Sequence, residues 1–256
     1  MGKLLESLGT QGYRTAYLSG VIFFTFWNAM LWLFRPPFRY REFIRQFEFI
    51  GFGSLFVVIL TGTFTGMVLA LQLYIGFSKF HAEYLVGAVA AISITRELGP
   101  VLSALMITAR AGSAMAAELG TMKVTEQVDA LESMAVEPIQ YLVTPRIVAA
   151  FLMFPLLTIV ADFMGILGSY VVGVHLLGIN PVVYMDKMVA LVEISDITSG
   201  LVKAAVFGVI VSSVSCGIGL QTSQGAVGVG RSTTSAVVLS STLILVADYL
   251  LTALMF

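Results

Sequence analysis

Long apolar runs alternate with short polar connections along this chain, and five of the runs are long enough to cross a lipid bilayer. They cover roughly residues 49–75, 85–109, 147–177, 201–220 and 235–256. A spanning helix needs about 20 mostly apolar residues, because each residue advances the helix by about 1.5 Å and the hydrocarbon core is about 30 Å thick. The pattern therefore predicts an all-α integral membrane protein with about five transmembrane helices.

A sixth apolar run, Leu18–Phe34, is slightly shorter than a span. Basic residues flank it on both sides, for example Arg14 and Arg35, so a spanning helix would place some of them outside the cell. That arrangement opposes the positive-inside tendency. An N-terminal interfacial or re-entrant helix, held at headgroup level by Trp27 and Trp32, fits the pattern better, with a true span as the alternative.

The composition agrees with a membrane protein. Hydrophobic residues make up 58% of the chain, charged residues only 11%, and the mean hydropathy is +0.94. Soluble domains carry about 25% charged residues, so this chain has too little polar surface for a water-soluble particle. The net charge of −1 gives no electrostatic reason to expect a nucleic-acid partner. Cys216 is the only cysteine, which excludes an intramolecular disulfide, and we interpret it as a packing residue.

The charge distribution between the spans predicts their orientation. With the basic N-terminal region in the cytoplasm, the loops 110–146 and 221–234 lie inside, and the loops 76–84 and 178–200 lie outside. The C-terminus then ends outside.

The most informative stretch is Thr95–Pro100, about halfway along the second predicted span. Arg96 and Glu97 each cost a few kcal/mol near the bilayer centre, so such residues usually face protein or a wet cavity. Pro100 has no N–H, so the carbonyl of Arg96 loses its helical hydrogen-bond partner, and Gly99 loosens the same turn. A broken helix at this depth is tolerated where it packs in protein or lines a cavity.

Two interpretations of Arg96 and Glu97 stay open. In the first, the two side chains edge a substrate cavity, with Arg96 able to meet an anionic headgroup. In the second, they form ion pairs that hold neighbouring helices together. Adjacent helical residues point about 100° apart, so the two side chains need not share one role.

Other polar residues interrupt the spans. Asp162 and Asp248 are acids inside the third and fifth spans, where a hydrogen bond between helices is the simpler interpretation and a proton relay is the alternative. Gln72 and Tyr74 form a polar rim at the outer end of the first span.

The segment Thr125–Ala135 predicts a short cytoplasmic helix. Thr125 is a candidate N-cap, Glu126 and Asp129 suit the positive end of the helix dipole, and Pro138 ends the helix. Its apolar stripe is narrow and comprises Val128, Leu131, Met134 and Ala135. Its polar face is acidic, which anionic lipid repels, so docking into a groove on a cytoplasmic partner is favoured over lying on the membrane.

Catalytic signatures are weak in this sequence. Gly225–Ser232 matches the P-loop pattern with Arg231 in place of lysine, but a span precedes it and a span follows it, so we interpret it as a Gly-rich cytoplasmic turn. The only histidines, His81 and His175, lie near span ends, and no H-E-x-x-H or G-x-S-x-G motif is present. We expect no catalytic centre and no metal site.

Small residues recur at four-residue spacing, which lets helix backbones approach closely in lipid. We expect most of them to pack helices within one subunit and some to form a subunit interface. The three series are Thr108, Gly112, Ala116 and Gly120; Gly165, Ser169 and Gly173; and Gly208, Ser212 and Cys216.

Several of these segments together resemble the MlaE permease family, and the similarity extends over nearly the whole chain. The residues that carry the resemblance are Arg96–Val101, Ala109–Ser113, Ala117–Lys123, Thr125–Gln127, Ala135–Pro138, Gly228–Thr234 and Asp248–Phe256. Members of this family are the membrane subunits of bacterial ABC transporters for phospholipids, grouped with MCE-domain proteins.

The resemblance implies a single permease domain over residues 1–256 of a multi-pass protein in the bacterial inner membrane. The N-terminal interfacial segment would cover 1–45 and the transmembrane core 49–256, with a coupling helix near 124–137. The N-terminus would be cytoplasmic and the C-terminus periplasmic.

The resemblance also implies partners and a site. The partners are a second copy of the chain, a cytoplasmic ATPase that uses the ATP, periplasmic MCE proteins, often a small STAS-domain protein, and the phospholipid substrate; the permease itself binds no cofactor and catalyses no reaction. The family's lipid pocket lies at the dimer interface, and Arg96 and Glu97 match its charged edge. The full set of candidate substrate-binding residues is Arg96, Glu97, Leu98, Gln72, Tyr74 and Asp248. The candidate ATPase-coupling residues are Glu118, Thr125, Glu126, Asp129, Leu131, Glu132 and Met134.

A stand-alone ion-coupled secondary transporter or channel, with Asp162, Asp248 and Glu97 as ion or proton ligands, is the alternative function. Such transporters often repeat broken helices in two halves of the chain, and this sequence shows no such repeat. A membrane scaffold without transport would leave the break at Arg96–Pro100 unexplained.

Overall fold

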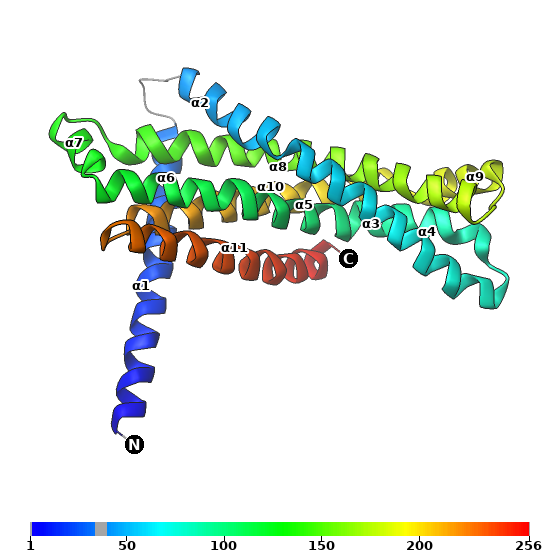
Figure 1. Ribbon diagram of the computed structural model, residues 1–256, viewed down its shortest axis with the longest axis horizontal. Helices are drawn as coiled ribbons and strands as arrows, with labels where there is room; N and C mark the ends of the chain where they lie inside the picture. Colours follow the sequence, from blue (N-terminus) through cyan, green and yellow to red (C-terminus); the bar gives the residue numbers. More distant parts are fainter. Residues whose placement is uncertain (1, 34–39, 256) are drawn as a thin grey trace.

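Five long helical segments lie side by side along the long axis of the molecule in the computed structural model, which describes residues 2–33 and 40–255 (Figure 1). The segments are Tyr40–Phe80, Glu83–Val124, Ile139–Leu176, Ile194–Leu220 and Gly225–Met255, and each is long and apolar enough to cross a membrane. The all-α fold and the five predicted spans are therefore confirmed. The helices extend past the apolar runs, because polar residues continue the helical backbone beyond the lipid.

Each long segment is built from shorter elements, and single π-helical turns interrupt the first three. In chain order the elements are α1 (Gly2–Leu33), α2 (Tyr40–Phe47), η1 (Glu48–Phe52), α3 (Gly53–Phe77), η2 (Ser78–Phe80), η3 (Glu83–Leu85), α4 (Val86–Ser93), η4 (Ile94–Leu98), α5 (Gly99–Ile107), η5 (Thr108–Gly112), α6 (Ser113–Val124), α7 (Gln127–Ser133), η6 (Ile139–Val143), α8 (Thr144–Tyr170), η7 (Val171–Leu176), α9 (Pro181–Leu191), α10 (Ile194–Leu220) and α11 (Gly225–Met255). The π-helical turns are η1, η4, η5, η6 and η7.

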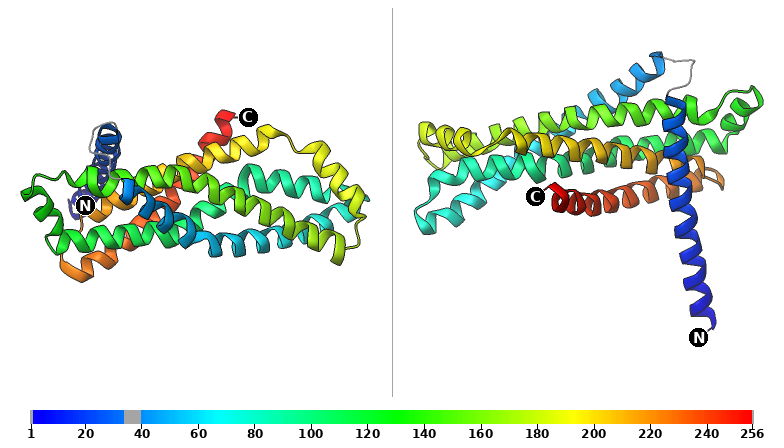
Figure 2. Two further views of the ribbon diagram at one scale, coloured as in Figure 1. Left: turned by 90° about the horizontal axis from the view of Figure 1, so that it is seen from above. Right: turned by 180° about the vertical axis from the view of Figure 1, so that it is seen from behind.

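The connections gather at two opposite ends of the bundle. We call them the α7 end, which also holds the turn between α10 and α11, and the α9 end, which also holds the connection between α3 and α4 (Figures 1 and 2). A groove lined by Val128, Glu132, Thr222 and Ser223 joins α7 to the α10–α11 turn. The grouping of the predicted loops, 110–146 with 221–234 and 76–84 with 178–200, is therefore correct.

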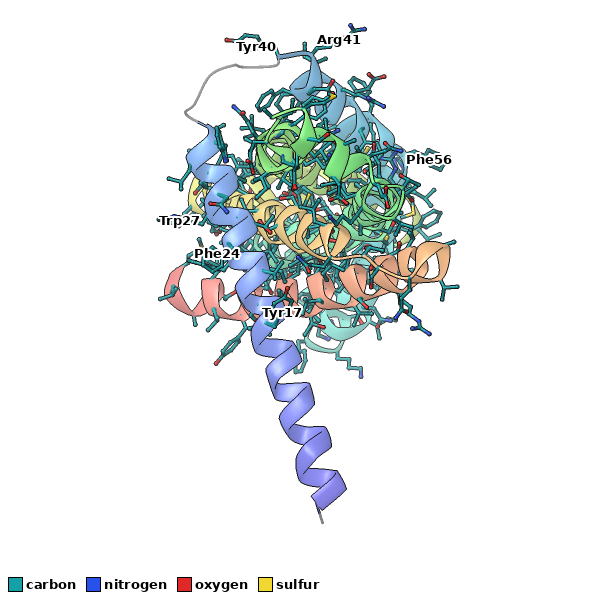
Figure 3. The ribbon with its side chains drawn as sticks, turned by 90° about the vertical axis from the view of Figure 1, so that its left-hand side faces the viewer. Tyr17, Phe24, Trp27, Tyr40, Arg41 and Phe56 are labelled. Carbon is teal, nitrogen blue, oxygen red and sulfur yellow. The ribbon has the colours of Figure 1, made fainter. Side chains whose placement is uncertain are left out.

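Helix α1 lies across the other helices near the α7 end rather than beside them (Figure 2, right). Its Ile22 packs on Gly217 of α10, and Ala29 is buried in a cluster with Cys216. Trp27 is exposed and stacks on Phe23, with ring centroids 6.2 Å apart, and Trp27 and Phe24 project from the same side of the helix (Figure 3). This crosswise placement agrees with the predicted interfacial helix; Phe34 and Arg35 lie outside the described residues.

Small residues bring the helix backbones together as expected for most of the three series. A Cβ built on Gly165 would lie 3.3 Å from the carbonyl oxygen of Gly62 on α3, and one on Gly208 would lie 2.6 Å from that of Ala150 on α8. Cys216 is fully buried. These positions pack helices within one chain.

Helix α9 was not predicted, although its start has a clear local signal. The side chain of Asn180 accepts hydrogen bonds from the N–H groups of Val182 and Val183, and Pro181 occupies the first helical position. The Tyr184 side chain is buried and forms a 2.9 Å hydrogen bond with Ser169 of α8, which stabilises the packing of α9 on the bundle. Burial raises the pKa of this phenol, so it stays neutral.

The interpretation of Gly225–Ser232 as a loop is wrong. The turn is confined to Gln221–Gln224, and α11 begins at Gly225. Gly228 makes this early start feasible, because a Cβ there would lie 1.6 Å from the carbonyl oxygen of Ser223. The glycines therefore let the helix pack tightly on its own preceding turn, and they form no phosphate-binding loop.

The coupling helix was predicted in the right place with the wrong ends. The Thr125 hydroxyl donates to the carbonyl of Thr121 within α6, so it does not cap α7. The residue before α7 is Glu126, whose positive φ of 60° turns the chain, and Ala135 turns it again with φ of 56°. Pro138 precedes η6 and starts the next segment instead of ending α7.

Gly66 provides a test of the close packing between α3 and α8. A Cβ on Gly66 would lie 1.8 Å from the carbonyl oxygen of Gly165, whereas one on Gly76 of the same helix meets nothing within 4 Å. We expect Gly66→Ala to lower the free energy of unfolding by about 1–3 kcal/mol, measured as a lower Tm in detergent. Gly76→Ala should be neutral or slightly stabilising, because alanine favours a helix. Equal Tm values for the two variants would contradict this packing.

Candidate functional site

The helix break predicted at Pro100 is present and takes the form of a π-helical turn. In η4 the hydrogen bonds reach five residues along the chain, so the N–H of Gly99 donates to the carbonyl of Ile94. In that register the carbonyl of Thr95 faces the missing N–H of Pro100, and in an ordinary α-helix the carbonyl of Arg96 would face it. The turn therefore presents two carbonyl groups that need partners from elsewhere.

Helix α10 approaches both carbonyl groups from one face and supplies a hydrogen-bond partner to one of them. A Cβ on Gly200 would lie 2.1 Å from the carbonyl oxygen of Thr95, so only glycine lets α10 approach the turn this closely. One turn later on the same face, the Nζ of Lys203 donates to the carbonyl oxygen of Arg96 at 3.1 Å. The predicted unpaired carbonyl exists, and an ammonium group satisfies it.

Lys203 is fully buried, and its ammonium group uses all three of its N–H donors. Besides the Arg96 carbonyl, it donates to Glu97 Oε2 at 2.7 Å and to Thr252 Oγ1 at 2.8 Å. Asp248 Oδ1 lies 3.1 Å from Nζ, close enough for an ion pair, and accepts no hydrogen bond from the described residues. One cation therefore joins the broken turn to α11.

A second ion pair joins the same turn to the start of α10. Nε and a terminal nitrogen of Arg96 both contact Asp196 Oδ1, and the Asp196 side chain is buried. The other carboxylate oxygen of Asp196 accepts the backbone N–H of Glu193 at 2.9 Å, which completes a capping box at the start of α10. The position of Arg96 is therefore coupled to the N-terminal cap of α10.

We call Arg96, Glu97, Asp196, Lys203 and Asp248 the ion cluster. Its formal charge is −1, from two cations and three carboxylates. The Arg96 and Glu97 side chains are 34% and 38% exposed, whereas that of Lys203 is 0% exposed. Arg96 and Glu97 both hold helices together, as one of the two sequence interpretations expects. Both side chains are also partly exposed, which we call the open side of the cluster, and their contact with substrate stays a prediction.

The cluster lies off the middle of the second helical segment, because this segment extends further toward the α7 end than the sequence suggested. The second segment contains 42 residues from Glu83 to Val124, and not the shorter predicted run 85–109. At about 1.5 Å per residue, Arg96 lies about 20 Å from one end of a helix about 60 Å long. The cluster is therefore not at the midpoint of this helix.

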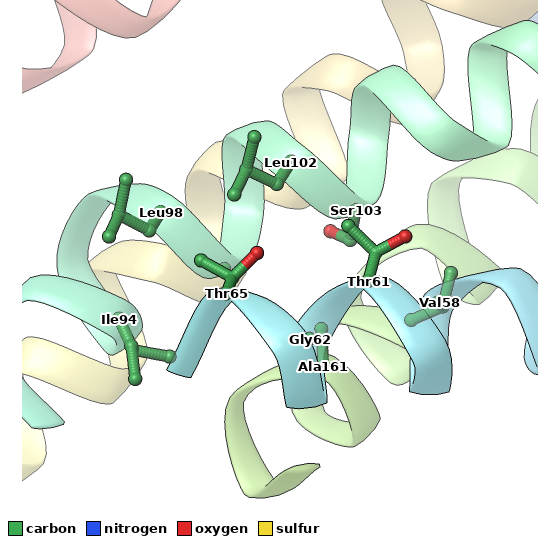
Figure 4. A pocket seen from close by; sticks show the side chains of 10 residues that line it. Val58, Thr61, Gly62, Thr65, Ile94, Leu98, Leu102, Ser103 and Ala161 are labelled. Carbon is green, nitrogen blue, oxygen red and sulfur yellow. The ribbon is translucent and has the colours of Figure 1, made fainter. Parts of the chain in front are cut away.

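The other predicted substrate residues lie in several separate places. Asp248 joins the cluster, whereas Leu98 lines a crevice between α3 and α5 with Thr65 (Figure 4). Tyr74 packs against the buried group around Tyr184, and Gln72 is exposed on α3. Within the described residues, no hydrogen bond or ion pair of the cluster involves these three side chains.

Asp162 does not make the expected hydrogen bond through its buried oxygen Oδ1. This atom packs on Gly99, where a Cβ would lie only 1.7 Å away, and it has no hydrogen-bond partner among the described residues. The N–H of Gly99 already donates to Ile94. The Oδ1 atom of Asp162 therefore packs against the broken turn without a hydrogen bond from the described residues.

The candidate coupling residues share the α7 end. In and beside α7, Val128 is buried and Leu131 packs in the same cluster, while Glu126 and Glu132 are exposed and Met134 is 67% exposed. Asp129 makes an ion pair with Lys123 at 2.5 Å. Only half of the predicted apolar stripe, Val128 and Leu131, thus rests on the bundle, and Met134 is exposed together with the acidic side chains.

Glu118 has a different position from the other coupling candidates. It lies on α6 and contacts Arg146 of α8 at 2.7 Å. Thr125 ends α6, as described above. These two residues therefore support the α7 end of the bundle rather than lying on α7.

Two residues of the cluster, Lys203 and Asp196, were not predicted from the sequence. Lys203 is one cation in the otherwise apolar run 201–220, and Asp196 precedes the predicted start of that run. A buried lysine needs an acid near it. The presence of Lys203 in one span, and of Glu97 and Asp248 in two others, was therefore the sequence signal that could have predicted this ion cluster.

A bundle of five spans with an ionic site at a broken helix defines an integral membrane protein of the transport-permease class. The sequence profile of the family described as Permease MlaE matches residues 43–254. The chain belongs to this family and is an ABC transporter permease of the MlaE type, a multi-pass inner-membrane protein.

Curated relatives agree over most of the chain. A protein of Rickettsia conorii named "Probable ABC transporter permease protein" is 47% identical over 253 residues, which cover 99% of this chain and 98% of the relative. The intermembrane phospholipid transport system permease protein MlaE of Haemophilus influenzae is 40% identical, over 83% of this chain and 82% of its own. Protein TRIGALACTOSYLDIACYLGLYCEROL 1 of Arabidopsis thaliana is 39% identical, over 90% of this chain and 65% of its own.

Lys203→Met tests whether one ammonium group stabilises the cluster. It leaves the carboxylates of Glu97 and Asp248 without their cation, and breaking a buried pair costs about 3–5 kcal/mol, so the Tm should fall. Adding Asp248→Asn to Lys203→Met should recover part of that loss, because one uncompensated charge is removed. Lys79→Met, at an exposed position, is the control. Additive effects of Lys203→Met and Asp248→Asn would contradict a shared cation.

Proposed function

We propose that this chain is the membrane-spanning subunit of an ABC transporter that moves phospholipids between the inner membrane and a periplasmic MCE-domain partner. ATP hydrolysis on a separate cytoplasmic subunit drives the movement, and the permease itself binds no nucleotide and does no chemistry. The Haemophilus relative is named for intermembrane phospholipid transport, which supports this class of substrate. Two copies of the chain form the working unit.

The observation that carries the proposal is the ion cluster at the broken turn. It joins three helices, and Arg96 and Glu97 keep an open side. A phosphate oxygen fits the guanidinium of Arg96, and an ammonium-bearing headgroup fits the carboxylate of Glu97. Small movements of α10 or α11 change these contacts, so the two states of the transporter bind the headgroup with different affinity, as transport requires.

The distribution of charge supports the assignment of the ATPase to the α7 end. Basic side chains that include Arg41, Arg45, Lys123 and Arg231 lie at this end, which the positive-inside tendency places in the cytoplasm. The outward face of α7 is acidic, with the apolar Met134 beside it. This face complements a groove with basic walls and an apolar floor, and the ATPase would supply it. The MCE partner, and in some systems a STAS protein on the ATPase, complete the assembly.

The alternative of an ion-coupled transporter gains no support from the cluster. Glu97 and Asp248 share the Lys203 ammonium group, so their carboxylates are already neutralised in part. Asp162 lies elsewhere, against Gly99.

The test is ATP-driven phospholipid transfer by the complex reconstituted in vesicles with its ATPase and MCE partners. We expect Arg96→Gln and Glu97→Gln each to lower transfer by about tenfold or more, because one charge-assisted contact to the headgroup is lost. ATPase binding should be retained. Asp186→Asn on α9, at an exposed acid that makes no hydrogen bond or ion pair with the cluster among the described residues, should transfer at the wild-type rate. Folded cluster variants with normal transfer would exclude the cluster as the substrate site.

The same assay separates coupling from substrate binding. Glu132→Lys reverses one charge on the outward face of α7 and should reduce copurification of the ATPase without lowering the Tm of the permease. Asp186→Lys is the matched charge reversal at the opposite end. Unchanged copurification with Glu132→Lys would exclude this face as the docking surface.

A further inference from the structure

A polar cavity of about 110 Å³ opens between α2, α6 and α8 at the α7 end, away from the ion cluster. It is lined by side chains of both charges: Glu42 and Arg45 from α2, Glu118 from α6 and Arg146 from α8. Gln46 of α2 completes its inner wall. The cavity is larger than one water molecule requires, so it has room for a charged group of a ligand.

The walls of this cavity contain buried polar atoms that lack partners. Arg146 is 3% exposed; it donates to the carbonyl of Leu142 and to Glu118, yet its Nε has no partner among the described residues. Gln46 is 7% exposed, and its Oε1 also lacks a partner. A buried guanidinium usually has its donors satisfied, because an unmet donor costs free energy. The pair therefore offers one donor and one acceptor to a ligand that enters the cavity.

The charges of the cavity specify the kind of ligand. Arg146 and Arg45 offer N–H donors for a phosphate, and Arg45 makes no ion pair within the part of the chain that the structure describes. Glu42 and Glu118 offer acceptors for an ammonium group on the same ligand. Two cations and two carboxylates around one cavity match a zwitterion better than a simple anion.

The surroundings of the cavity favour a lipid over a dissolved compound. Ile44 of α2 is exposed, and Phe52 and Phe56 continue an exposed apolar surface along the same segment toward the membrane core (Figure 3 shows Phe56 at the edge of the bundle). The exposed Arg45, which lines the cavity, follows Ile44 directly in α2, so a lipid whose headgroup contacts Arg45 could rest its acyl chains against this surface. The cavity also lies beside the start of two spans, where headgroups of one leaflet are found.

We propose that this cavity binds the headgroup of a phospholipid with an ammonium group, such as phosphatidylethanolamine, from the leaflet at the α7 end. The phosphate contacts Arg146 and Arg45, and the ammonium group contacts Glu42 and Glu118. The lipid bound here is separate from substrate at the ion cluster. The test of this second lipid site measures binding and not transport. A negative result there would therefore overturn the second site without bearing on the proposed transport function.

The experiment uses the full chain in nanodiscs of phosphatidylglycerol that contain a minor fraction of photoreactive phosphatidylethanolamine with its reactive group near the headgroup. Light-induced labelling is mapped by mass spectrometry of peptides. We expect label on peptides that contain Met122 or Tyr141, two residues that line the cavity. Arg45→Gln should reduce this label by about tenfold, because an exposed position loses one charge-assisted contact. Arg146→Lys should reduce it as well while keeping a cation beside Glu118.

Three controls decide the result. Arg231→Gln removes an exposed arginine of α11 and should label like the wild type. Photoreactive phosphatidylglycerol should label the cavity about tenfold less, since it lacks the ammonium group. Soluble glycerophosphoethanolamine should not compete. Labelling that is absent from these peptides, or equal in Arg45→Gln and Arg231→Gln, would overturn the site. Equal labelling by the two lipids would overturn the preference for an ammonium group, and full competition by the soluble compound would overturn the lipid as its source.

Discussion

Pro100 removes one backbone N–H from a helix that crosses the membrane, and Lys203 compensates for it. The ammonium group bonds the carbonyl of Arg96 and at the same time pairs with Glu97, so a backbone defect and a buried charge satisfy each other. Neither would be tolerated alone in lipid. Gly200 permits the close approach, and Asp248 draws α11 to the same cation. The relative positions of three spans therefore depend on one side chain.

The same physical solution recurs at two other π-helical turns of the molecule. Arg110 donates to the carbonyl of Phe49 within η1, and Arg146 donates to the carbonyl of Leu142 within η6. Each π-helical turn changes the hydrogen-bond register and leaves carbonyl groups pointing sideways, where a long cationic side chain can reach them. These contacts give each carbonyl group a charge-assisted hydrogen bond from a side chain, which can change its acceptor when helices move. That property suits a transporter, whose helices must shift relative to one another without exposing bare carbonyl groups to lipid.

Sequence patterns predicted the features that depend on local chemistry and missed those that depend on contacts across the chain. Apolar length was enough to predict the five spans, and Pro100 alone predicted the unpaired carbonyl of Arg96. The partner of that carbonyl lies more than one hundred residues away, so no local pattern identifies Lys203. The start of α11 was missed because glycines usually break helices, whereas Gly228 here permits contact with the preceding turn. The fold does not test whether Arg96 and Glu97 contact the substrate, so this part of the site stays a prediction.

Site-specific photocrosslinking in cells that contain the ATPase and MCE partners tests the account most directly. A photoreactive phenylalanine at the exposed Tyr249, the residue after Asp248, samples the surface of α11 beside the ion cluster, and one at the exposed Phe64 samples the outer face of α3. If the cluster binds the transported lipid, phospholipid captured at Tyr249 will change when the partner ATPase is inactivated, while capture at Phe64 stays constant. Capture that is unaffected by the ATPase at both positions would contradict the assignment of the ion cluster as the substrate site.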